Sequence, residues 1–512
     1  MVYVIGVSSG MFMAAEQSEK PRYMTIPRKI FTGGLEGVNF TQIDIESITE
    51  FMEPHLEKET KKIKEAGIKF GVHGESYAMG GAERPIGMLD SAIEIEYIHA
   101  HERLIQHIEG CGKIGAEFVN IHPSETVPFI RLGTHLQPTT LVDFSGKPLK
   151  KFLEENNDIL NWAIEQEFIS SIFMHRATSL TLKQLIKAKE EELKEEKKEV
   201  DKGEIEKSAK ETFKRYLLNL VSSSDLTYGS ERIAYYIIAK WMQDNGDALW
   251  KSIVGKHIKD EDLEKPNKMK EWVPAVSAKY IWGHFNPKDT KKFPDPKKLL
   301  EKYKMYFVFE TGMGSPGIEG MQRFSKPKDM IFMCKIIGSK WVGACLDFEH
   351  VLSQNMSPEK EIEAIPYGMA NILKVCHIGF PTPHTPAHMP IPLGSSEQYY
   401  LYERLFELRK KGFKDGWIIF ERGSSPREDT ILAMRLIKEF LEKDVLPKQL
   451  PLSFFGMKPE GPEIKRQELA IKEHALDPLK GMLAVPEEEY TFLSKAAIEK
   501  GKAEEWKKEK YR

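Results

Sequence analysis

Six short hydrophobic segments in this chain each end in a histidine, an aspartate or a glutamate. The six end residues are far apart in the sequence: His73, His122, Glu310, Asp347, His377 and Glu421. A barrel of parallel strands gathers the carboxyl ends of its strands around one mouth. Such a barrel would bring these six side chains to one place. This pattern constrains the fold more than any other feature of the sequence.

Strand-like and helix-like segments alternate in the two outer parts of the chain, which is typical of parallel α/β structure. In the first part, strands are expected at 2–7, 37–43, 70–72 and 118–121, and amphipathic helices at 48–66 and 90–110. In the last part, helices are expected at 294–303, 327–337, 358–371, 397–411 and 428–441. The resulting seven or eight strand–helix units predict an α/β fold of the TIM (β/α)8-barrel type.

The middle of the chain breaks this alternation, because its pattern is mainly helical. Residues 187–214 carry a dense mixture of lysine and glutamate, which predicts a solvated helix or a flexible excursion. A nucleic-acid-binding arm is the alternative, but mixed acid and base disfavour a phosphate-binding stripe. We therefore expect three parts: a barrel made of 1–135 and 291–445, a long helical insertion at 136–290, and a C-terminal extension with a helical tail at 446–512.

Composition narrows the function and the location. The formal net charge is −3, so the chain has no global basic field for strong non-specific nucleic-acid binding. Its four cysteines form no C-x-x-C pair, which favours a reducing, cytoplasmic location. The first residues lack a basic segment and are expected to form a strand rather than a signal peptide. No apolar stretch reaches the roughly 18 residues of a membrane span, so no membrane contact is expected.

The two glutamates are the strongest single candidates for a functional role. Glu310 and Glu421 each follow a run of aromatic and aliphatic residues, where an unpaired carboxylate is costly to bury. A cation or a base must meet each of them, and a salt bridge inside the barrel is the structural alternative. Considered singly, histidines such as His73 and His122 at a strand end are more often hydrogen-bonded structural residues than metal ligands.

Three further histidines extend the candidate set. His350 follows Asp347 by three residues, so one turn can place both beside the same cavity. His384 and His388 lie in a proline-rich loop after His377, which either holds ligands rigidly or is an ordinary surface loop. Imidazoles and carboxylates in this combination suit zinc or manganese, so the sequence predicts a metal cluster at the barrel mouth.

These motifs resemble those of the endonuclease IV family (AP endonuclease family 2), within the xylose-isomerase-like TIM-barrel superfamily. The resemblance covers roughly residues 1–135 and 291–425. The first matching motifs are Val72-His73 with Tyr77, then Asn120-Ile121-His122-Pro123-Ser124, then Phe309-Glu310-Thr311-Gly312. The later ones are Cys345-Leu346-Asp347-Phe348-Glu349-His350, His377 and Ile418-Ile419-Phe420-Glu421.

One position departs from the family pattern. The family has an Asp-x-His pair, whereas this chain has Pro386-Ala387-His388. Proline offers no side-chain ligand, so a third cation would lose a carboxylate unless His384 replaces it. The ligands of a two-cation site remain complete.

The resemblance implies a metal-dependent hydrolase, a phosphodiesterase that acts on DNA at abasic sites through two or three zinc ions, with manganese as the alternative metal. It implies metal ligation by the six strand-end residues together with His350 and His388. Glu310, Glu421 and His350 would be catalytic: the glutamates orient the attacking water and the histidine stabilises the leaving oxygen. Tyr77 and His384 are expected to bind substrate, although a tyrosine packed at the rim explains Tyr77 equally well.

Two other functions remain open at this point. A sugar isomerase or epimerase on the same scaffold would use a carboxylate-rich site for one divalent cation. A non-catalytic component of a repair complex would bind metal only structurally. DNA is the expected partner of both the hydrolase and the repair-complex component. The helical insertion is expected to be a surface for a protein partner.

Overall fold

The computed structural model describes residues 3–9, 25–35, 37–75, 88–124, 140–166, 169, 182–195, 201–222, 228–246, 269–312, 324–382, 385–421 and 428–457. The chain divides into two compact units, Met1–Leu450 and Pro451–Arg512. In the second unit the described residues form one short 3-10 helix, η8 (Leu452–Phe455). All elements below belong to the first unit.

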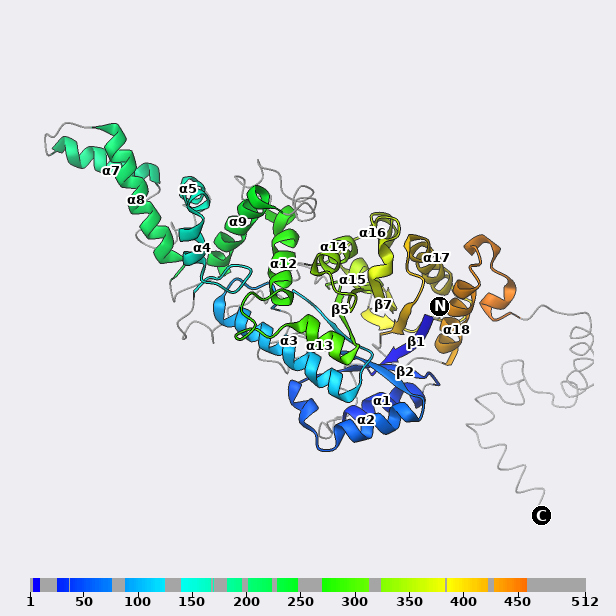
Figure 1. The fold of residues 1–512 in the computed structure, drawn as a ribbon. Helices are drawn as coiled ribbons and strands as arrows, with labels where there is room; N and C mark the ends of the chain where they lie inside the picture. Colours follow the sequence, from blue (N-terminus) through cyan, green and yellow to red (C-terminus); the bar gives the residue numbers. More distant parts are fainter. Residues whose placement is uncertain are drawn as a thin grey trace, which may run out of the picture. The chain divides into compact units, whose positions relative to one another are not determined.

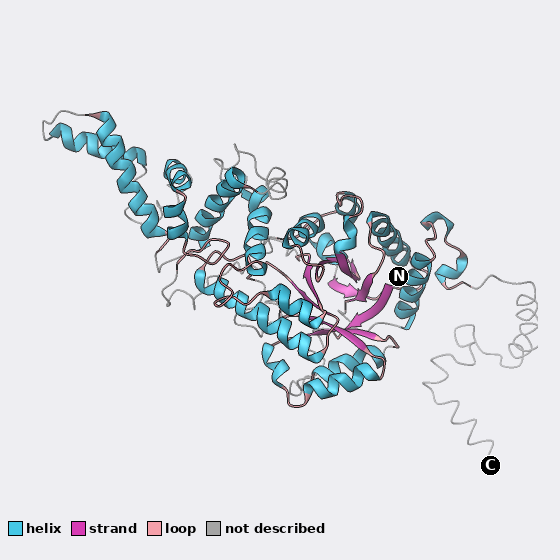
Figure 2. Ribbon diagram, viewed as in Figure 1, coloured by secondary structure: helices cyan, strands magenta, loops and turns pink. Residues whose placement is uncertain are grey.

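Eight parallel strands form a closed barrel, as the sequence predicted (Figures 1 and 2). In barrel order they are β1 (Tyr3–Ser8), β2 (Phe40–Asp44), β3 (Lys69–His73), β4 (Phe118–Ile121), β5 (Tyr306–Glu310), β6 (Val342–Asp347), β7 (Leu373–Ile378) and β10 (Gly416–Phe420). The ring is closed by pairing of β1 with β10, where Tyr3 lies opposite Gly416. The long segment between β4 and β5 carries the helical insertion.

Helices cover the outside of this barrel. They are α1 (Ile26–Leu35), α2 (Leu56–Glu65), α3 (Glu94–Ile114), α13 (Pro296–Tyr303), α14 (Pro327–Ile337), α15 (Phe348–Ser353), α16 (Pro358–Glu363), α17 (Ser396–Lys411) and α18 (Glu428–Glu442). Local sequence fixes several of their ends. Pro327 opens α14 at a position where its missing N–H costs nothing, and Gly338 ends it in the left-handed region with φ 72°.

Two helices that the sequence predicted as continuous are interrupted. The expected helix 48–66 is split into the 3-10 helix η2 (Ile48–Met52) and α2, because Pro54 keeps the residue before it extended; Glu53 has ψ 135°. The expected helix 358–371 is split into α16 and the 3-10 helix η6 (Met369–Ile372), with Gly368 at φ 80° between them.

One helix and one strand boundary were not anticipated. Helix α1 fits closely on β2 at Gly33, where a Cβ would overlap the side chain of Thr41. The strand expected at 37–43 begins only at Phe40, because Gly37 forms a turn with φ 75°. Both features depend on packing and on backbone geometry rather than on hydrophobic periodicity.

Apolar side chains fill the barrel interior beneath the strand ends. The buried cluster consists of Phe40, Phe118, Val308, Cys345, Val375 and Ile419. The rings of Phe40 and Phe118 stack with centroids 5.8 Å apart. Gly71 on β3 makes room for Phe118, since a Cβ there would overlap the ring. This packed floor leaves polar residues to the carboxyl ends of the strands.

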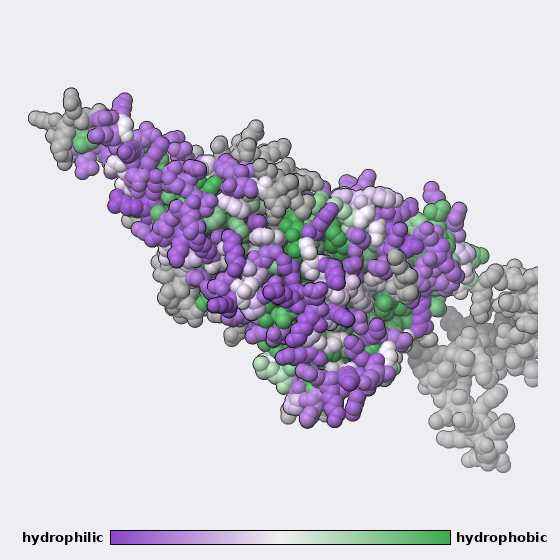
Figure 3. Space-filling view, in the orientation of Figure 1, coloured by the Kyte–Doolittle hydropathy of each residue, from purple (hydrophilic) through white to green (hydrophobic). Residues whose placement is uncertain are grey.

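In the described residues the insertion is mainly helical, with α4 (Leu149–Glu155), α5 (Asn157–Glu165), α7 (Leu182–Glu195), α8 (Lys202–Leu220), α9 (Tyr228–Asn245) and α12 (Met269–Phe285). The charged run forms α7 and α8, whose surface is mainly hydrophilic (Figure 3). Helix α8 buries Ile205, Ala209 and Phe213 at a spacing of four. A hydrogen bond from the N–H of Ala92 to Glu231, 2.9 Å long, links α9 to the start of α3.

Within the described part of the chain, we find no helix with the length and apolar content required for a membrane span.

Candidate metal centre

The barrel brings all six strand-end residues to its carboxyl-terminal mouth. His73, Glu310 and Asp347 are the last residues of β3, β5 and β6, and His377 is the last but one of β7. His122 and Glu421 directly follow β4 and β10. Because these side chains leave neighbouring strands at the same level, they meet around one spot.

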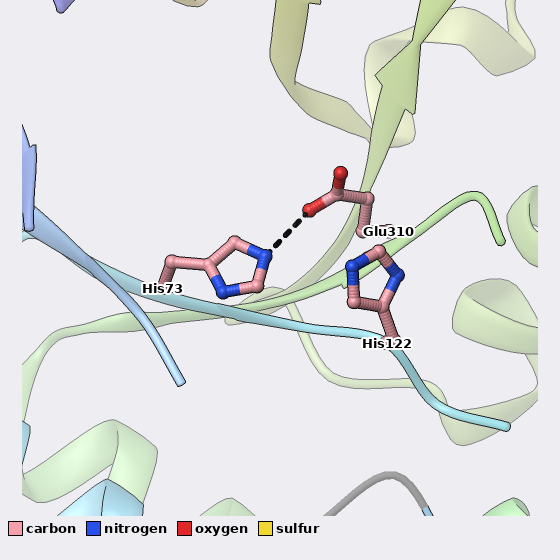
Figure 4. Close-up of side chains that lie close together, drawn as sticks. All are labelled: His73, His122 and Glu310. Carbon is pink, nitrogen blue, oxygen red and sulfur yellow. Dashed lines mark hydrogen bonds and ion pairs between the residues drawn. The ribbon is translucent and has the colours of Figure 1, made fainter. Parts of the chain in front are cut away.

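The first group consists of His73, His122 and Glu310, which point toward one another in Figure 4. One ligand atom of each lies within 4.8 Å of the others. Nε2 of His73 lies 3.2 Å from Oε2 of Glu310. The ring centroids of His73 and His122 are 5.3 Å apart, and both imidazoles lie beside the carboxylate of Glu310.

The second group surrounds one nitrogen of His377. Its Nδ1 lies 3.0 Å from Oε1 of Glu310, 3.1 Å from Oε2 of Glu421 and 3.4 Å from Oδ2 of Asp347. Three carboxylates within this distance would repel one another strongly in a buried place without positive charge between them. The group therefore has the composition of a cation site.

Glu310 belongs to both groups. Its side chain is fully buried, and its two oxygens face different histidines: Oε2 faces His73 and Oε1 faces His377. Asn120 donates a further hydrogen bond to Oε2 from its side-chain amide. The carboxylate is thus held between the two groups.

The charges of these groups are coupled. Burial opposes ionisation of Glu310, but the charge of His377 and the hydrogen bonds from His377 and His73 hold the pKa of Glu310 well below its usual value. Burial alone would lower the pKa of His73, whereas the hydrogen bond and the charge of Glu310 raise it to about 9. The pKa of His377 is likewise raised by nearby acid groups against the effect of burial.

His122 shows that the residues fit a metal ion. Burial lowers the pKa of His122 to about 3, so its ring is neutral at pH 7, the form in which imidazole binds metal. Its Nδ1 is buried and has no hydrogen-bond partner within the described residues. A neutral ring with an unused nitrogen, beside shared carboxylates, suits zinc or manganese.

His350 lies at the edge of the same cluster. Its ring Nδ1 is 2.8 Å from the carbonyl oxygen of Thr311 and 3.3 Å from Oε1 of Glu310. The backbone N–H of His350 donates a hydrogen bond to Oδ1 of Asp347. The side chain of Asp347 therefore caps α15 and positions His350 at the same time. The role of His350 as a ligand or proton carrier stays a prediction.

The remaining predicted site residues lie outside what the structure describes. Tyr77 and His384 fall outside the described residues, and of Pro386 and His388 only the backbone is described. The proline-rich segment was expected to be a loop, but it forms an antiparallel hairpin of β8 (Phe380–Thr382) and β9 (Thr385–Met389). A two-stranded hairpin tolerates proline because each strand has a free edge.

Sequence reasoning missed two buried amides that hold the candidate ligands. Asn120 supports Glu310, and Oε1 of Gln42 lies 2.9 Å from Nε2 of His377. Strand alternation contained a signal for Asn120, which lies two residues before His122. Gln42 gave no such signal, because no predicted site residue follows it on its own strand. Cys345 was also missed; its thiol lies near His377, and burial raises its pKa to about 12.

No family model matches the chain, and no curated protein matches it significantly. Solved structures of similar fold include a D-tagatose 3-epimerase-like protein, with 12% identity, a TM-score of 0.39, and coverage of 86% of this chain and 98% of the other. They also include a D-psicose 3-epimerase with 10% identity and a TM-score of 0.37, covering 92% of this chain and 98% of the other. At TM-scores this low, the likeness carries no argument about the reaction. The closed barrel itself defines the fold class.

Proposed function

We propose that this chain is a divalent-cation-dependent enzyme whose reaction takes place at the carboxyl end of the barrel, and that its cation centre is dinuclear. One observation carries the proposal: the two oxygens of the buried Glu310 carboxylate face different histidines, His73 and His377. Paired cations that share a carboxylate are typical of enzymes that hydrolyse phosphate esters.

The two groups divide the ligands between two cations. His73 and His122 would hold one cation, whereas Asp347, His377 and Glu421 would hold the other, with Glu310 shared. When bound, such cations supply positive charge for an anionic transition state and lower the pKa of water toward neutrality. Zinc is the proposed metal, with manganese as the alternative.

Glu421 and His350 would handle the protons. Glu421 has 16% of its side chain exposed, whereas Glu310 and Asp347 have 0% and 1%, so Glu421 is the carboxylate of the group that a water or a substrate can reach. It would orient the attacking water and accept its proton. His350, held through Nδ1 by Thr311, would present Nε2 to the leaving oxygen.

We propose a phosphodiester as the substrate, with abasic duplex DNA as the first to test. This finer assignment is supported by the resemblance of the strand-end motifs to the endonuclease IV family. The long helical insertion between β4 and β5 would then be the surface for a protein partner or for the flanking duplex.

A sugar isomerase or epimerase with one cation is the second candidate. Glu310, Asp347, His377 and Glu421 form a four-ligand group by themselves, and three of the four are carboxylates. Such a carboxylate-rich site suits a single divalent cation that polarises a hydroxy-ketone. Two of the solved structures named above are 3-epimerases or resemble one, but with TM-scores below 0.5 they do not help to choose between the two candidates.

The test combines cation counting with two assays. Purified protein is loaded with Zn²⁺ or Mn²⁺, its metal content is measured, and it is offered abasic duplex DNA and a set of ketohexoses. The dinuclear hydrolase predicts two cations per chain and DNA nicking that falls by about 100-fold or more in Glu310→Gln, since the shared ligand is lost. Surface variant Glu439→Gln is the control.

Two results would decide against the hydrolase. One bound cation with ketohexose epimerisation and no nicking would select the second candidate. No cation uptake by the folded wild-type protein would contradict both enzymes and also the non-catalytic component, which binds metal structurally.

A further inference from the structure

Gln42 is a buried residue whose side-chain amide contacts the candidate ligand His377. It lies on β2, has no exposed surface, and its Oε1 is 2.9 Å from Nε2 of His377. The amide nitrogen of the same side chain has no hydrogen-bond partner within the described residues. An unpaired buried donor is costly, so the orientation of this amide calls for an explanation.

The two ring nitrogens of His377 have different surroundings. Nδ1 faces the three carboxylates of the second group, of which Glu310 is the nearest at 3.0 Å. Nε2 faces the amide oxygen of Gln42. An amide oxygen can only accept a hydrogen bond, so Nε2 must be the donor and must carry a proton.

We propose that Gln42 is a positioning residue: it keeps the ring proton of His377 on Nε2 and thereby leaves the lone pair of Nδ1 for a cation among the carboxylates. This inference rests on the proposed function, because it concerns the same centre. A neutral imidazole has one N–H and one lone pair, and the partner of the N–H decides which nitrogen binds metal.

The opposite orientation of the amide would prevent this binding. If the amide nitrogen of Gln42 faced His377, Nε2 would have to offer its lone pair and Nδ1 would carry the proton. That proton would point among the carboxylates, in the position where the cation belongs. The amide nitrogen of Gln42 therefore stays unpaired because the orientation that leaves Nδ1 of His377 free for a cation turns it away from the ring.

A neutral hydrogen-bond acceptor also suits the surroundings of His377, which already contain several negative charges. Metal-binding histidines often donate their second N–H to a carboxylate. Here Glu310, Asp347 and Glu421 already surround Nδ1 of the same ring. An amide orients the imidazole without adding a fourth negative charge to a buried site.

The first test is made on the wild-type protein. Histidine is labelled with ¹⁵N, the protein is loaded with Zn²⁺, and the tautomer of His377 is read from its ¹⁵N shifts and ring-proton couplings. The His377 signals are identified by their absence in His377→Gln. The expected result is a proton on Nε2 that exchanges slowly with water. A proton on Nδ1 overturns the inference.

The second test measures affinity for Zn²⁺ and the visible spectrum of the Co²⁺ form in Gln42→Leu and Gln42→Met, which keep the volume but lose the acceptor. Binding weaker by about 10- to 100-fold and an altered Co²⁺ spectrum are expected. Thr41→Val is the matched control, because Thr41 is on the same strand and donates to the carbonyl of Ile30, away from the centre.

Equal affinity in wild type and in both Gln42 variants overturns the inference but leaves the proposed function standing. If the wild-type protein itself takes up no cation, the proposed function fails and this inference fails with it. Should both Gln42 variants fail to fold, the tautomer of the wild-type ring still decides.

Discussion

Nδ1 of His101 lies 3.2 Å from Nδ1 of His284, so one histidine of barrel helix α3 is hydrogen-bonded to one of insertion helix α12. Nε2 of His101 also lies 3.0 Å from the carbonyl of Pro294, which can only accept. Nε2–H of His101 is therefore the donor there, and Nδ1–H of His284 donates to Nδ1 of His101. Both rings are buried. Protonation of His101 at Nδ1 would remove the acceptor of this hydrogen bond, and protonation of His284 at Nε2 would place a charge on a buried nitrogen that has no hydrogen-bond partner within the described residues.

This pair predicts acid sensitivity of the contact between insertion and barrel. Burial lowers the pKa of His101 to about 4 and that of His284 well below its usual value. Because the folded-state pKa is depressed, the unfolded chain binds more protons below pH 6.5. The stability is complete above pH 6.5 and is lost as the pH falls toward 4, by roughly 3 kcal/mol for His101. Urea unfolding between pH 7 and pH 4 measures this loss.

The variant His284→Phe provides the comparison for the pH effect. It keeps a ring stacked on Tyr97, whose centroid lies 4.0 Å from that of His284. The variant should be less stable than wild type at pH 7 but should lose less stability toward pH 4. Parallel curves for the two proteins would contradict the assignment of the effect to this pair.

Replacement of His122 by glutamine should remove one cation and leave the other. His122 belongs only to the first group, whereas Glu310 belongs to both. Metal analysis of His122→Gln is expected to give one tightly bound cation per chain instead of two, and hydrolysis should fall by about 100-fold because the paired cations act together. Loss of both cations would show that the two groups do not bind independently.

The barrel floor should not tolerate a side chain on β3. In Gly71→Ala the new methyl group would overlap the ring of Phe118, so a loss of about 1–3 kcal/mol in the free energy of unfolding is expected. Chemical denaturation measures it. The double variant with Phe118→Leu should recover part of the loss, because the smaller side chain makes room. Purely additive losses would mean that the two positions do not share this space.

Lys29 should matter far more for stability than an exposed lysine. Its buried ammonium donates to the carbonyl of Asp44 and to Oε2 of Glu50, both at 2.7 Å. Lys29→Met leaves these acceptors without their donor, and a loss of about 3 kcal/mol is expected. Lys61→Met is the control, since Lys61 pairs with Glu65 at the exposed surface. Similar melting temperatures for both variants would contradict this view.

The sequence was informative where burial makes a residue costly. Glu310 at the end of an apolar strand could be recognised because an unpaired carboxylate is not tolerated there, and the same reasoning led to Glu421. Gln42 and Asn120 carry no charge, so they gave a much weaker signal inside apolar runs. Their importance depends on which strand lies opposite, and that is a property of the closed barrel.

The features that sequence reasoning missed depend on tertiary structure. Helix α1 contains Gly33 and Gly34, which lower its intrinsic helical tendency, and it forms where Gly33 fits against Thr41. The hairpin of β8 and β9 contains prolines that argue against strands, yet its free edges need no proline N–H. In both cases, packing overrode the local preference.

The pairing of β1 with β10 has a consequence for how the chain is made. A ribosome releases Tyr3 long before Gly416, its partner across the seam, so the first strand must wait with one edge open. His73 and His122 likewise emerge well before Glu310, which follows the whole insertion. Any segment that shields these early strands during synthesis would protect the nascent protein from aggregation until the ring can close.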